Sequence, residues 1–287
     1  MLTRFAPSPT GELHLGHAYS AALAHAAARA AGGHFRIRID DIDGSRSREE
    51  HVAAALADLE WLGLDRDGDP VRQSRHLGDY AAALDHLRGR GLVYPCFCTR
   101  ADIAQSLAAP HGPPDASGAA AYPGTCRRLP EAERERRLAG DPHCWRLDMA
   151  RAAALAGALG WEEAGQGMRA ADPAAHGDVV LARKDAPASY HLASTIDDAA
   201  MGVTHVIRGA DLIASTDVHR LLQALLGLAT PVYRHHGLVC GPDGKRLAKR
   251  DAAAALASLR DSGVDGPALA ADLLAQRLPA GYSLQIP

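Results

Sequence analysis

The spacing of apolar residues at the start of the chain predicts a strand, a helix and a second strand. Apolar positions around residues 3–4 favour a first strand, which must stop at residues 7–11, Pro-Ser-Pro-Thr-Gly, because each proline removes a backbone donor from the ladder. An alanine-rich helix is expected over residues 13–31, and residues 34–39 alternate as a strand does. The pattern therefore predicts a right-handed β-α-β unit with a stiff loop after its first strand.

Apolar spacing over the rest of the chain continues the alternation of helix and strand, with one interruption. The stretch after Tyr94-Pro95 is rich in alanine, proline and glycine, which is typical of an insertion with a long loop. Four segments are expected. The first half of an α/β domain covers residues 1–95, an insertion covers 96–177, and the second half of the domain covers 178–238. A basic loop followed by one or two helices covers 239–287. Helices are expected at 47–63, 76–90, 190–198 and 215–226, and extended chain at 73–75, 179–181, 204–208 and 231–238.

Composition limits where such a protein acts. The chain has 287 residues, of which 47% are hydrophobic, enough for a substantial core. It contains no apolar run of about 18 residues and no N-terminal signal pattern, so we expect a globular, cytoplasmic monomer without a membrane span. A net charge of −3 gives no general attraction to polyanions, so nucleic-acid contact would depend on local basic residues such as Arg127-Arg128 and residues 134–137. Residues 131–137 fit an exposed helix of mixed charge at least as well.

His14-Leu15-Gly16-His17 is the first candidate for chemistry. Both histidines fall at the N-terminus of the expected helix, where free N–H groups and the helix dipole favour phosphate, and Gly16 leaves room for a flat ring. The chain has 15 histidines, so a pattern this short is also explained by two surface histidines. The second candidate is the basic cluster at residues 245–250, where a lysine can stabilise the negative charge of a phosphate. The alternative is an exposed basic turn whose charges are solvated.

Together these two motifs resemble the paired signatures of class I aminoacyl-tRNA synthetases, His-Leu-Gly-His at 14–17 and Arg-Leu-Ala-Lys-Arg at 246–250. Residues 4–11, Arg-Phe-Ala-Pro-Ser-Pro-Thr-Gly, and residues 36–43 are similar to the glutamyl branch of that family. A further matching block near residues 190–211 extends the resemblance over nearly the whole chain. It implies an α/β fold with a Rossmann-like parallel sheet, split by the insertion and closed by short C-terminal helices.

The resemblance also implies a reaction and the residues that perform it. L-Glutamate would attack the α-phosphate of ATP, which carries Mg²⁺, to give glutamyl-adenylate. His14, His17 and Lys249 would act in catalysis. The ATP site would comprise His14, Gly16, His17, Gly209, Asp211 and Lys249. Ala248 stands where the family usually has serine, so one of the family's hydrogen bonds to phosphate is not expected here.

For the amino acid, the resemblance implies a pocket made of Arg4, Ala6, Ser8, Asp40, Tyr190 and Arg208. A glutamate substrate needs an arginine that binds its second carboxylate, and Arg4 and Arg208 are the candidates. Asp40 would take the α-amino group. The family generally has the longer glutamate there, so a water molecule can bridge the contact. From the residues alone, Tyr190 would be a core tyrosine and Arg208 a surface arginine at a strand end.

Five unevenly placed cysteines favour a metal site over a disulfide framework. Cys96, Cys98 and Cys126 lie within the insertion, and thiolates are strong ligands of zinc, which would hold together a segment too small for its own core. Chemistry alone leaves the fourth ligand open among Cys144, His111 and His143. The resemblance implies Tyr122 instead, with one structural zinc ion. Three buried free cysteines are the alternative without metal.

The expected acceptor of glutamate rests on the length of the chain. Full-length members of the glutamyl branch continue into helical domains that read the anticodon, whereas this chain ends soon after residues 246–250. It resembles the shorter members that attach glutamate to queuosine in the anticodon loop of tRNA(Asp), which implies activation of glutamate without bound tRNA. The alternatives are a paralogue that charges a tRNA 3′ end, a non-catalytic regulator that binds glutamate or RNA, and a small-molecule nucleotidyltransferase.

Overall fold

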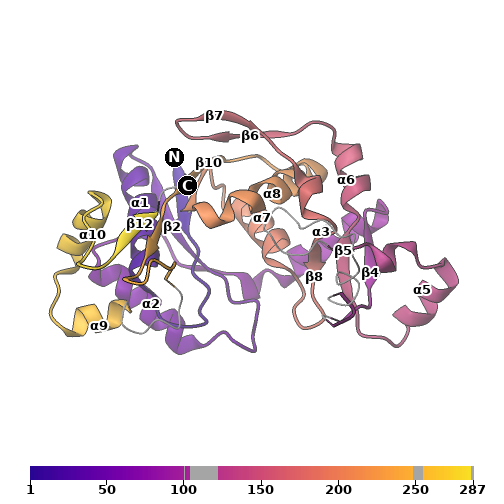
Figure 1. Ribbon diagram of the computed structural model, residues 1–287, viewed down its shortest axis with the longest axis horizontal. Helices are drawn as coiled ribbons and strands as arrows, with labels where there is room; N and C mark the ends of the chain where they lie inside the picture. Colours follow the sequence, from indigo (N-terminus) through magenta and orange to yellow (C-terminus); the bar gives the residue numbers. More distant parts are fainter. Residues whose placement is uncertain (100, 104–121, 248–254, 286–287) are drawn as a thin grey trace.

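The structure is a computed structural model that describes residues 1–99, 101–103, 122–247 and 255–285. Its first part is the predicted β-α-β unit: β1 and β2 are parallel neighbours, β3 continues their sheet, and α1 packs on both strands (Figure 1). The elements of this part are β1 (Leu2–Phe5), α1 (Leu15–Ala30), β2 (His34–Ile39), α2 (Glu49–Trp61), β3 (Val71–Arg72) and α3 (Leu77–Gly89).

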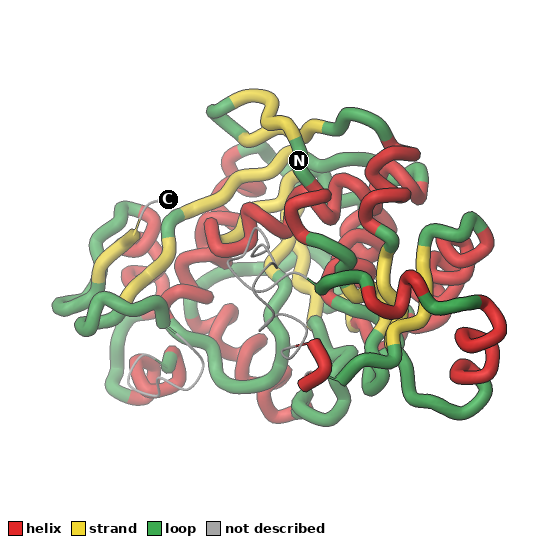
Figure 2. Tube along the Cα trace, turned by 45° about the vertical axis from the view of Figure 1, so that its right-hand side comes forward, coloured by secondary structure: helices red, strands yellow, loops and turns green. Residues whose placement is uncertain are grey.

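The second half adds two more parallel strands, β9 and β10, beside β1. The backbone N–H of Thr204, just before β9, donates to the carbonyl of Leu2 at 3.0 Å. Figure 2 shows these strands passing through the middle of the molecule between helices, which confirms the α/β class with a parallel sheet. The elements of this half are β8 (Val180–Ala182), α7 (Tyr190–Ala200), β9 (His205–Gly209), α8 (Ile213–Leu226) and β10 (Val232–His236).

The segment between the two halves carries antiparallel pairs. β4, β5 and β8 form one three-stranded sheet, whereas β6 pairs with β7 in a hairpin and with β10 along its other edge. Strands from both sides of residue 177 therefore share sheets. The elements of this segment are β4 (Val93–Cys96), α5 (Glu131–Leu138), β5 (Cys144–Leu147), α6 (Met149–Ala156), β6 (Gly160–Glu163) and β7 (Gly167–Ala170).

The chain from residue 255 onward returns to the start of α1. The N–H of Leu256 donates to the carbonyl of Leu13 at 2.9 Å, and Ala255 forms a β-bridge with His14. This contact anchors the segment after the second motif beside the first motif. One or two helices were expected here, and the structure has two, α9 (Leu256–Asp261) and α10 (Gly266–Leu274). They are followed by β12 (Ser283–Gln285), which pairs antiparallel with the earlier strand β11 (Leu238–Cys240).

Two large hydrophobic cores flank the region where β1 meets β9. One joins α1, β1, β2 and α2 to the C-terminal helices, and the other joins α3, α6, α7 and α8. The C-terminal ends of β1, β2 and β9 open between them, which is where ligands bind in open α/β sheets. Within the described ranges, no helix is long and apolar enough to cross a membrane.

Candidate active site

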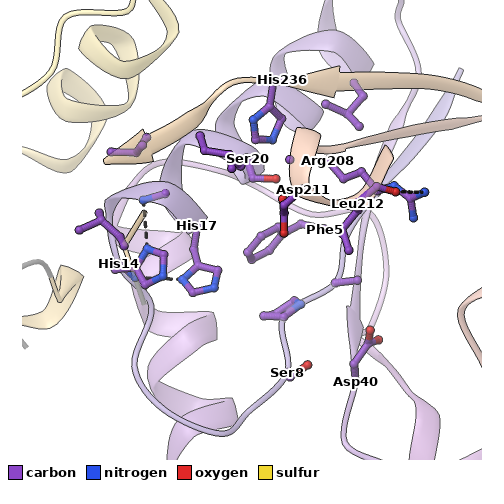
Figure 3. Close-up of a pocket in the computed structure, with 18 of the residues that line it drawn as sticks. Phe5, Ser8, His14, His17, Ser20, Asp40, Arg208, Asp211, Leu212 and His236 are labelled. Atoms are coloured by element: carbon purple, nitrogen blue, oxygen red, sulfur yellow. Dashed lines mark hydrogen bonds between the residues drawn. The ribbon is translucent and has the colours of Figure 1, made fainter. Parts of the chain in front are cut away.

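A cavity of about 420 Å³ lies at the C-terminal ends of β1, β2 and β9. Figure 3 shows His14 and His17 on one side of it and Asp40 and Arg208 on the other. The pocket brings together every predicted residue of the ATP and glutamate sites except Lys249, which lies outside the described residues, as does Ala248. The lining includes Arg4, Ala6, Ser8, His14, Gly16, His17, Asp40, Tyr190, Arg208, Gly209 and Asp211.

The two histidines of the first motif cap α1 with their own side chains. Nδ1 of His14 accepts from the N–H of Gly16 at 3.2 Å, and Nδ1 of His17 accepts from the N–H of His14 at 3.1 Å. The ring centroids are 3.8 Å apart. Because both Nδ1 atoms accept, the hydrogen bonds assign the proton of each neutral ring to Nε2. Two imidazole donors beside a helix N-terminus suit an anionic phosphate.

Both glycines of the predicted ATP site lie against side chains that a Cβ would press on. A Cβ at Gly16 would lie 3.1 Å from Cε1 of His14, so a side chain would press on the ring. A Cβ at Gly209 would collide with the carboxylate of Asp211, which folds back over it. Asp211 Oδ2 also pairs with Arg246 at 2.9 Å, so the first residue of the second motif reaches the end of β9.

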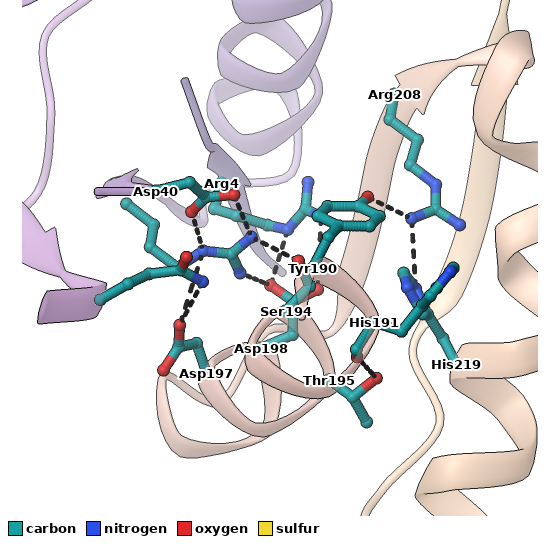
Figure 4. A network of polar contacts seen from close by, with 12 residues as sticks. Arg4, Asp40, Tyr190, His191, Ser194, Thr195, Asp197, Asp198, Arg208 and His219 are labelled. Carbon is teal, nitrogen blue, oxygen red and sulfur yellow. Dashed lines mark hydrogen bonds and ion pairs between the residues drawn. The ribbon is translucent and has the colours of Figure 1, made fainter. Parts of the chain in front are cut away.

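Arg4, one of the two candidate arginines for substrate carboxylate, is bound to an aspartate of α7. Its Nε and a terminal nitrogen donate to Asp198 at 2.8 and 3.3 Å. Asp198 also accepts from Arg38 at 2.6 Å, and Arg38 holds both oxygens of Asp40, at 2.7 and 3.2 Å. Figure 4 shows Arg4, Asp40 and Asp198 within this network. Both cations are therefore paired with carboxylates, and Asp40 is already engaged by Arg38.

Burial and charge act in opposite directions on these carboxyl groups. Burial raises the pKa of Asp40 and of Asp197, although Arg38 lies beside both. Burial also favours the neutral acid at Asp198, but the charges of Arg4 and Arg38 outweigh it and lower the pKa of that group. Asp198 is therefore the carboxylate that balances the charges of Arg4 and Arg38 on this side of the pocket.

Arg208 has a different environment, because all its direct partners are neutral. It is 5% exposed and Tyr190 is 39% exposed, the reverse of what the residues alone indicate. A guanidinium has five N–H donors. Those of Arg208 meet the hydroxyl of Tyr190 at 3.2 Å, Nδ1 of His219 at 3.3 Å, Nε2 of His235 at 3.3 Å, the carbonyl of Leu212 at 3.2 Å and Oγ1 of Thr216 at 2.8 Å. No acceptor in this set carries a charge.

The histidines that contact Arg208 stay neutral near pH 7. Burial, followed by the charge of Arg208, lowers the pKa of His219 well below its ordinary value and that of His235 to about 4. Glu163 fixes the tautomer of His235, since its carboxylate accepts from Nδ1–H and from the backbone N–H, each at 2.7 Å. Nε2 of His235 therefore presents a lone pair to Arg208.

Sequence reasoning missed the residues that support these arginines. A signal for Arg38 existed, because it lies two positions before Asp40 and alternate strand residues share a face. Asp198 lies eight positions after Tyr190 in α7, a spacing that places both on one side of a helix. Glu163, His219 and His235 belong to three different elements, β6, α8 and β10, and no linear spacing connects them.

The three cysteines of the predicted metal site converge. The sulfurs of Cys96, Cys98 and Cys126 lie within 4.8 Å of one another, and the hydroxyl oxygen of Tyr122 is 3.6 Å from the sulfur of Cys98. A tetrahedral zinc with bonds of about 2.3 Å keeps its sulfurs roughly 3.8 Å apart. The donor set therefore fits such an ion, and the cluster could hold a metal. The N–H of Cys126 also donates to the hydroxyl of Tyr122 at 2.9 Å, which keeps the phenol at the cluster.

The other expected candidates for the fourth ligand lie around this cluster. Cys144 is buried directly opposite Cys96 in the antiparallel pair of β4 and β5. The ring of His143 packs on Phe97 and Trp145, with centroids 5.8 and 5.3 Å away. His111 lies outside the described residues.

The basic residues expected to contact RNA are largely paired within the protein. Arg127 donates to Asp178 at 3.1 Å and to Asp148 at 3.3 Å. On α5, Arg136 pairs with Glu133 and Arg137 with Asp141, each at 2.7 Å. This helix is exposed and of mixed charge, as the alternative interpretation held.

Comparisons with known proteins agree with the family that the sequence motifs resemble. The family described as "tRNA synthetases class I (E and Q), catalytic domain" matches residues 1–275. A protein of Rhodobacter capsulatus named "Glutamyl-Q tRNA(Asp) synthetase" is 49% identical over 92% of this chain and 96% of its own length. A protein of the same name from Symbiobacterium thermophilum is 44% identical over 91% of this chain and 81% of its own length.

Solved structures of glutamate-tRNA ligases share the fold. The enzyme of Elizabethkingia meningosepticum, in complex with its amino acid, has a TM-score of 0.73 and 31% identity, and that of Elizabethkingia anophelis has a TM-score of 0.74 at the same identity. Each likeness covers 88% of this chain. The chain spans about half the length of these two ligases, 52% and 53%.

Proposed function

The chain belongs to the class I tRNA synthetases for glutamate and glutamine, and within them to the glutamyl-Q tRNA(Asp) synthetases, and on this basis we propose that it activates L-glutamate with ATP and transfers it to queuosine in tRNA(Asp). The observation that carries the proposal is the buried cation of Arg208, which faces a pocket shared with the histidines of α1 and has no charged direct partner. The activation step proceeds without bound tRNA, in the cytoplasm, where tRNA is found.

The amino acid occupies the side of the pocket formed by β1, β2 and α7. The side-chain carboxylate of glutamate lies beside Arg208 and is attracted by its charge, because the five N–H groups of Arg208 already have acceptors in the protein. Tyr190, whose hydroxyl oxygen accepts from Arg208, turns its own proton toward the substrate and makes the direct hydrogen bond. Asp40 takes the α-ammonium group with the lone pairs that Arg38 leaves. Arg4, Ala6 and Ser8 form the wall beside it.

ATP occupies the side of the pocket formed by α1 and the end of β9. His14 and His17 donate from Nε2 to the phosphates, and Gly16, Gly209 and Asp211 contact the nucleoside. Mg²⁺ accompanies the phosphates and neutralises part of their charge. Lys249 stabilises the charge that develops as the glutamate α-carboxylate attacks the α-phosphate and pyrophosphate leaves.

The metal cluster has a structural role in this proposal. Cys96, Cys98, Tyr122 and Cys126 hold one zinc ion, which joins β4 to the segment before α5. Three thiolates and a phenolate saturate a tetrahedral ion, so no position is left for catalysis. Metal analysis of the purified protein should give one zinc per chain, and Cys126→Ala should lose it. A metal-free native protein would contradict this assignment.

The activation step is tested by glutamate-dependent exchange of labelled pyrophosphate into ATP in the absence of tRNA. The transfer step is tested with labelled glutamate, ATP and two tRNA(Asp) preparations, one with queuosine and one with guanosine at the wobble position. We expect label only on the queuosine form, and label that survives periodate oxidation of the 3′ end. Label on both preparations would instead indicate charging of the 3′ end, and no exchange would contradict the activation step itself.

A further inference from the structure

The orientation of Arg208 is fixed by side chains from two separate elements, β10 and α8. His235 on β10 receives its Nε–H, Thr216 on α8 receives an N–H of one terminal nitrogen, and His219 on α8 receives an N–H of the other. Behind His235 lies Glu163 of β6, which is 2% exposed and bonds only to His235 among the described side chains. A buried carboxylate one imidazole away from a buried guanidinium requires an explanation, because desolvating each charge is costly.

We propose that Glu163, His235 and Thr216 are positioning residues that hold Arg208 ready for a carboxylate and so set the preference for glutamate over its side-chain amide. This inference rests on the proposed activation of glutamate. None of the three residues is needed to touch the substrate: they act through Arg208, which lines the pocket whereas they do not.

The chain of hydrogen bonds has one direction. Both oxygens of Glu163 accept from His235, one from the backbone N–H and one from Nδ1–H, so the ring proton lies on Nδ1 and the lone pair on Nε2. That lone pair is what Nε–H of Arg208 requires. The hydroxyl of Thr216 lies 3.2 Å from the same Nε2 and accepts from Arg208 at 2.8 Å, so it links the two groups a second time. With the other tautomer, two N–H groups would face each other and Arg208 would lose its orientation.

The use of neutral acceptors keeps the charge of Arg208 available. A carboxylate in direct contact would neutralise the guanidinium, as Asp198 does for Arg4. The pocket would then gain little by binding a second carboxylate. With neutral acceptors the nearest negative charge comes from the substrate, whereas glutamine, which has none, leaves the buried cation with only the more distant carboxylates of Glu163 and Asp198. The arrangement therefore discriminates by charge rather than by shape.

Glu163→Gln is the sharpest test, because glutamine has nearly the same shape. The amide oxygen of glutamine can still accept from the backbone N–H of His235, and its NH₂ group then faces Nδ1 of that ring. Nδ1 must become an acceptor, so the ring proton moves to Nε2, where it faces the Nε–H of Arg208. In pyrophosphate exchange we expect the KM for glutamate to rise roughly tenfold or more, with the KM for ATP unchanged. The ratio of kcat/KM for glutamate over glutamine should fall by a similar factor, and ¹⁵N shifts should report the altered tautomer of His235.

Glu162→Gln is the matched control, since Glu162 is the neighbouring residue of β6 and is exposed. It should behave as wild type.

Thr216→Val is the second variant, which removes a hydroxyl acceptor of Arg208 without a change in size and should also raise the KM for glutamate selectively. If wild type exchanges pyrophosphate and neither E163Q nor T216V differs from E162Q, the positioning role is overturned while the proposed function stands. If wild type shows no exchange, the proposed function fails first.

Discussion

The two sides of the glutamate pocket treat a buried arginine in opposite ways. Arg4 and Arg38 are bound to Asp198 and Asp40 at 2.6–3.3 Å, so their charges are neutralised within the protein. Arg208 makes five hydrogen bonds, more than either of them, but to hydroxyls, imidazoles and a carbonyl. Hydrogen bonding alone therefore does not distinguish a structural arginine from a recognition arginine. The charge of the acceptors does.

Arg38→Gln should give the largest effect, and that effect should be on stability. The change leaves Asp40 and Asp198 without their strongest shared cation in a buried site, which typically costs about 3–5 kcal/mol. Urea denaturation should show this loss in the free energy of unfolding. If R38Q is as stable as wild type, the carboxylates are not held by charge and the two sides of the pocket are more alike than described.

Arg208→Gln should produce the opposite profile. Because no carboxylate is paired directly with Arg208, its removal should lower the free energy of unfolding by less than R38Q does, and the loss should reflect only the neutral acceptors left without a donor. Glutamate activation should fall roughly 10²- to 10³-fold in kcat/KM, the usual size for loss of a buried charged contact to a ligand. Denaturation and pyrophosphate exchange on the same sample compare the two quantities. A variant that loses stability but not activity would break the comparison.

His219→Asn should alter the pH dependence of stability. The pKa of His219 is lowered in the folded protein, so the unfolded chain takes up a proton first as pH falls below about 6.5, and this favours unfolding by up to about 1.4 kcal/mol per pH unit. Asparagine keeps an acceptor near the position of Nδ1 but does not titrate. We expect the stability of H219N to fall less steeply than that of wild type between pH 6.5 and pH 5. Parallel curves would mean that His219 titrates normally.

Asp40→Glu should have the smallest effect. The longer side chain reaches one methylene further toward the α-ammonium group, but Arg38 already holds both oxygens at position 40. We expect the KM for glutamate to fall by about threefold at most, because a water-mediated contact is nearly as good as a direct one. A larger gain in glutamate exchange would mean that Arg38 releases this carboxylate when substrate binds.

Local patterns were sufficient to predict much of the fold. The prolines at positions 7 and 9 end β1 after Phe5, Gly32-Gly33 follow α1, and the alternation of residues 34–39 matches β2. α2 begins at Glu49, two residues after the predicted start, and its N-cap residue Arg48 makes no capping hydrogen bond with its side chain. The pairing of β6 with β10 was not predictable, since it joins segments about 70 residues apart whose register no local pattern specifies.

The candidate site was predictable where motifs are contiguous. Residues 4–17 and 208–211 supply half of the pocket lining, and the resemblance supplied the roles of Arg208, Tyr190 and Asp40. The burial of individual side chains was not predictable. The residues alone placed Arg208 at the surface, because a charged group at a strand end is usually solvated. It is buried because His219, His235 and Thr216 supply acceptors from β10 and α8, and their positions depend on packing between distant segments.

The absence of a carboxylate in direct contact with Arg208, among the described residues, also bears on how long the protein survives in a cell. A folded state that gains a missing counter-charge from its substrate is favoured over partly opened states by mass action. Proteases cleave those opened states, so their rate of attack falls as the pool of free amino acid rises. The abundance of the protein would then follow the supply of its substrate without any change in synthesis.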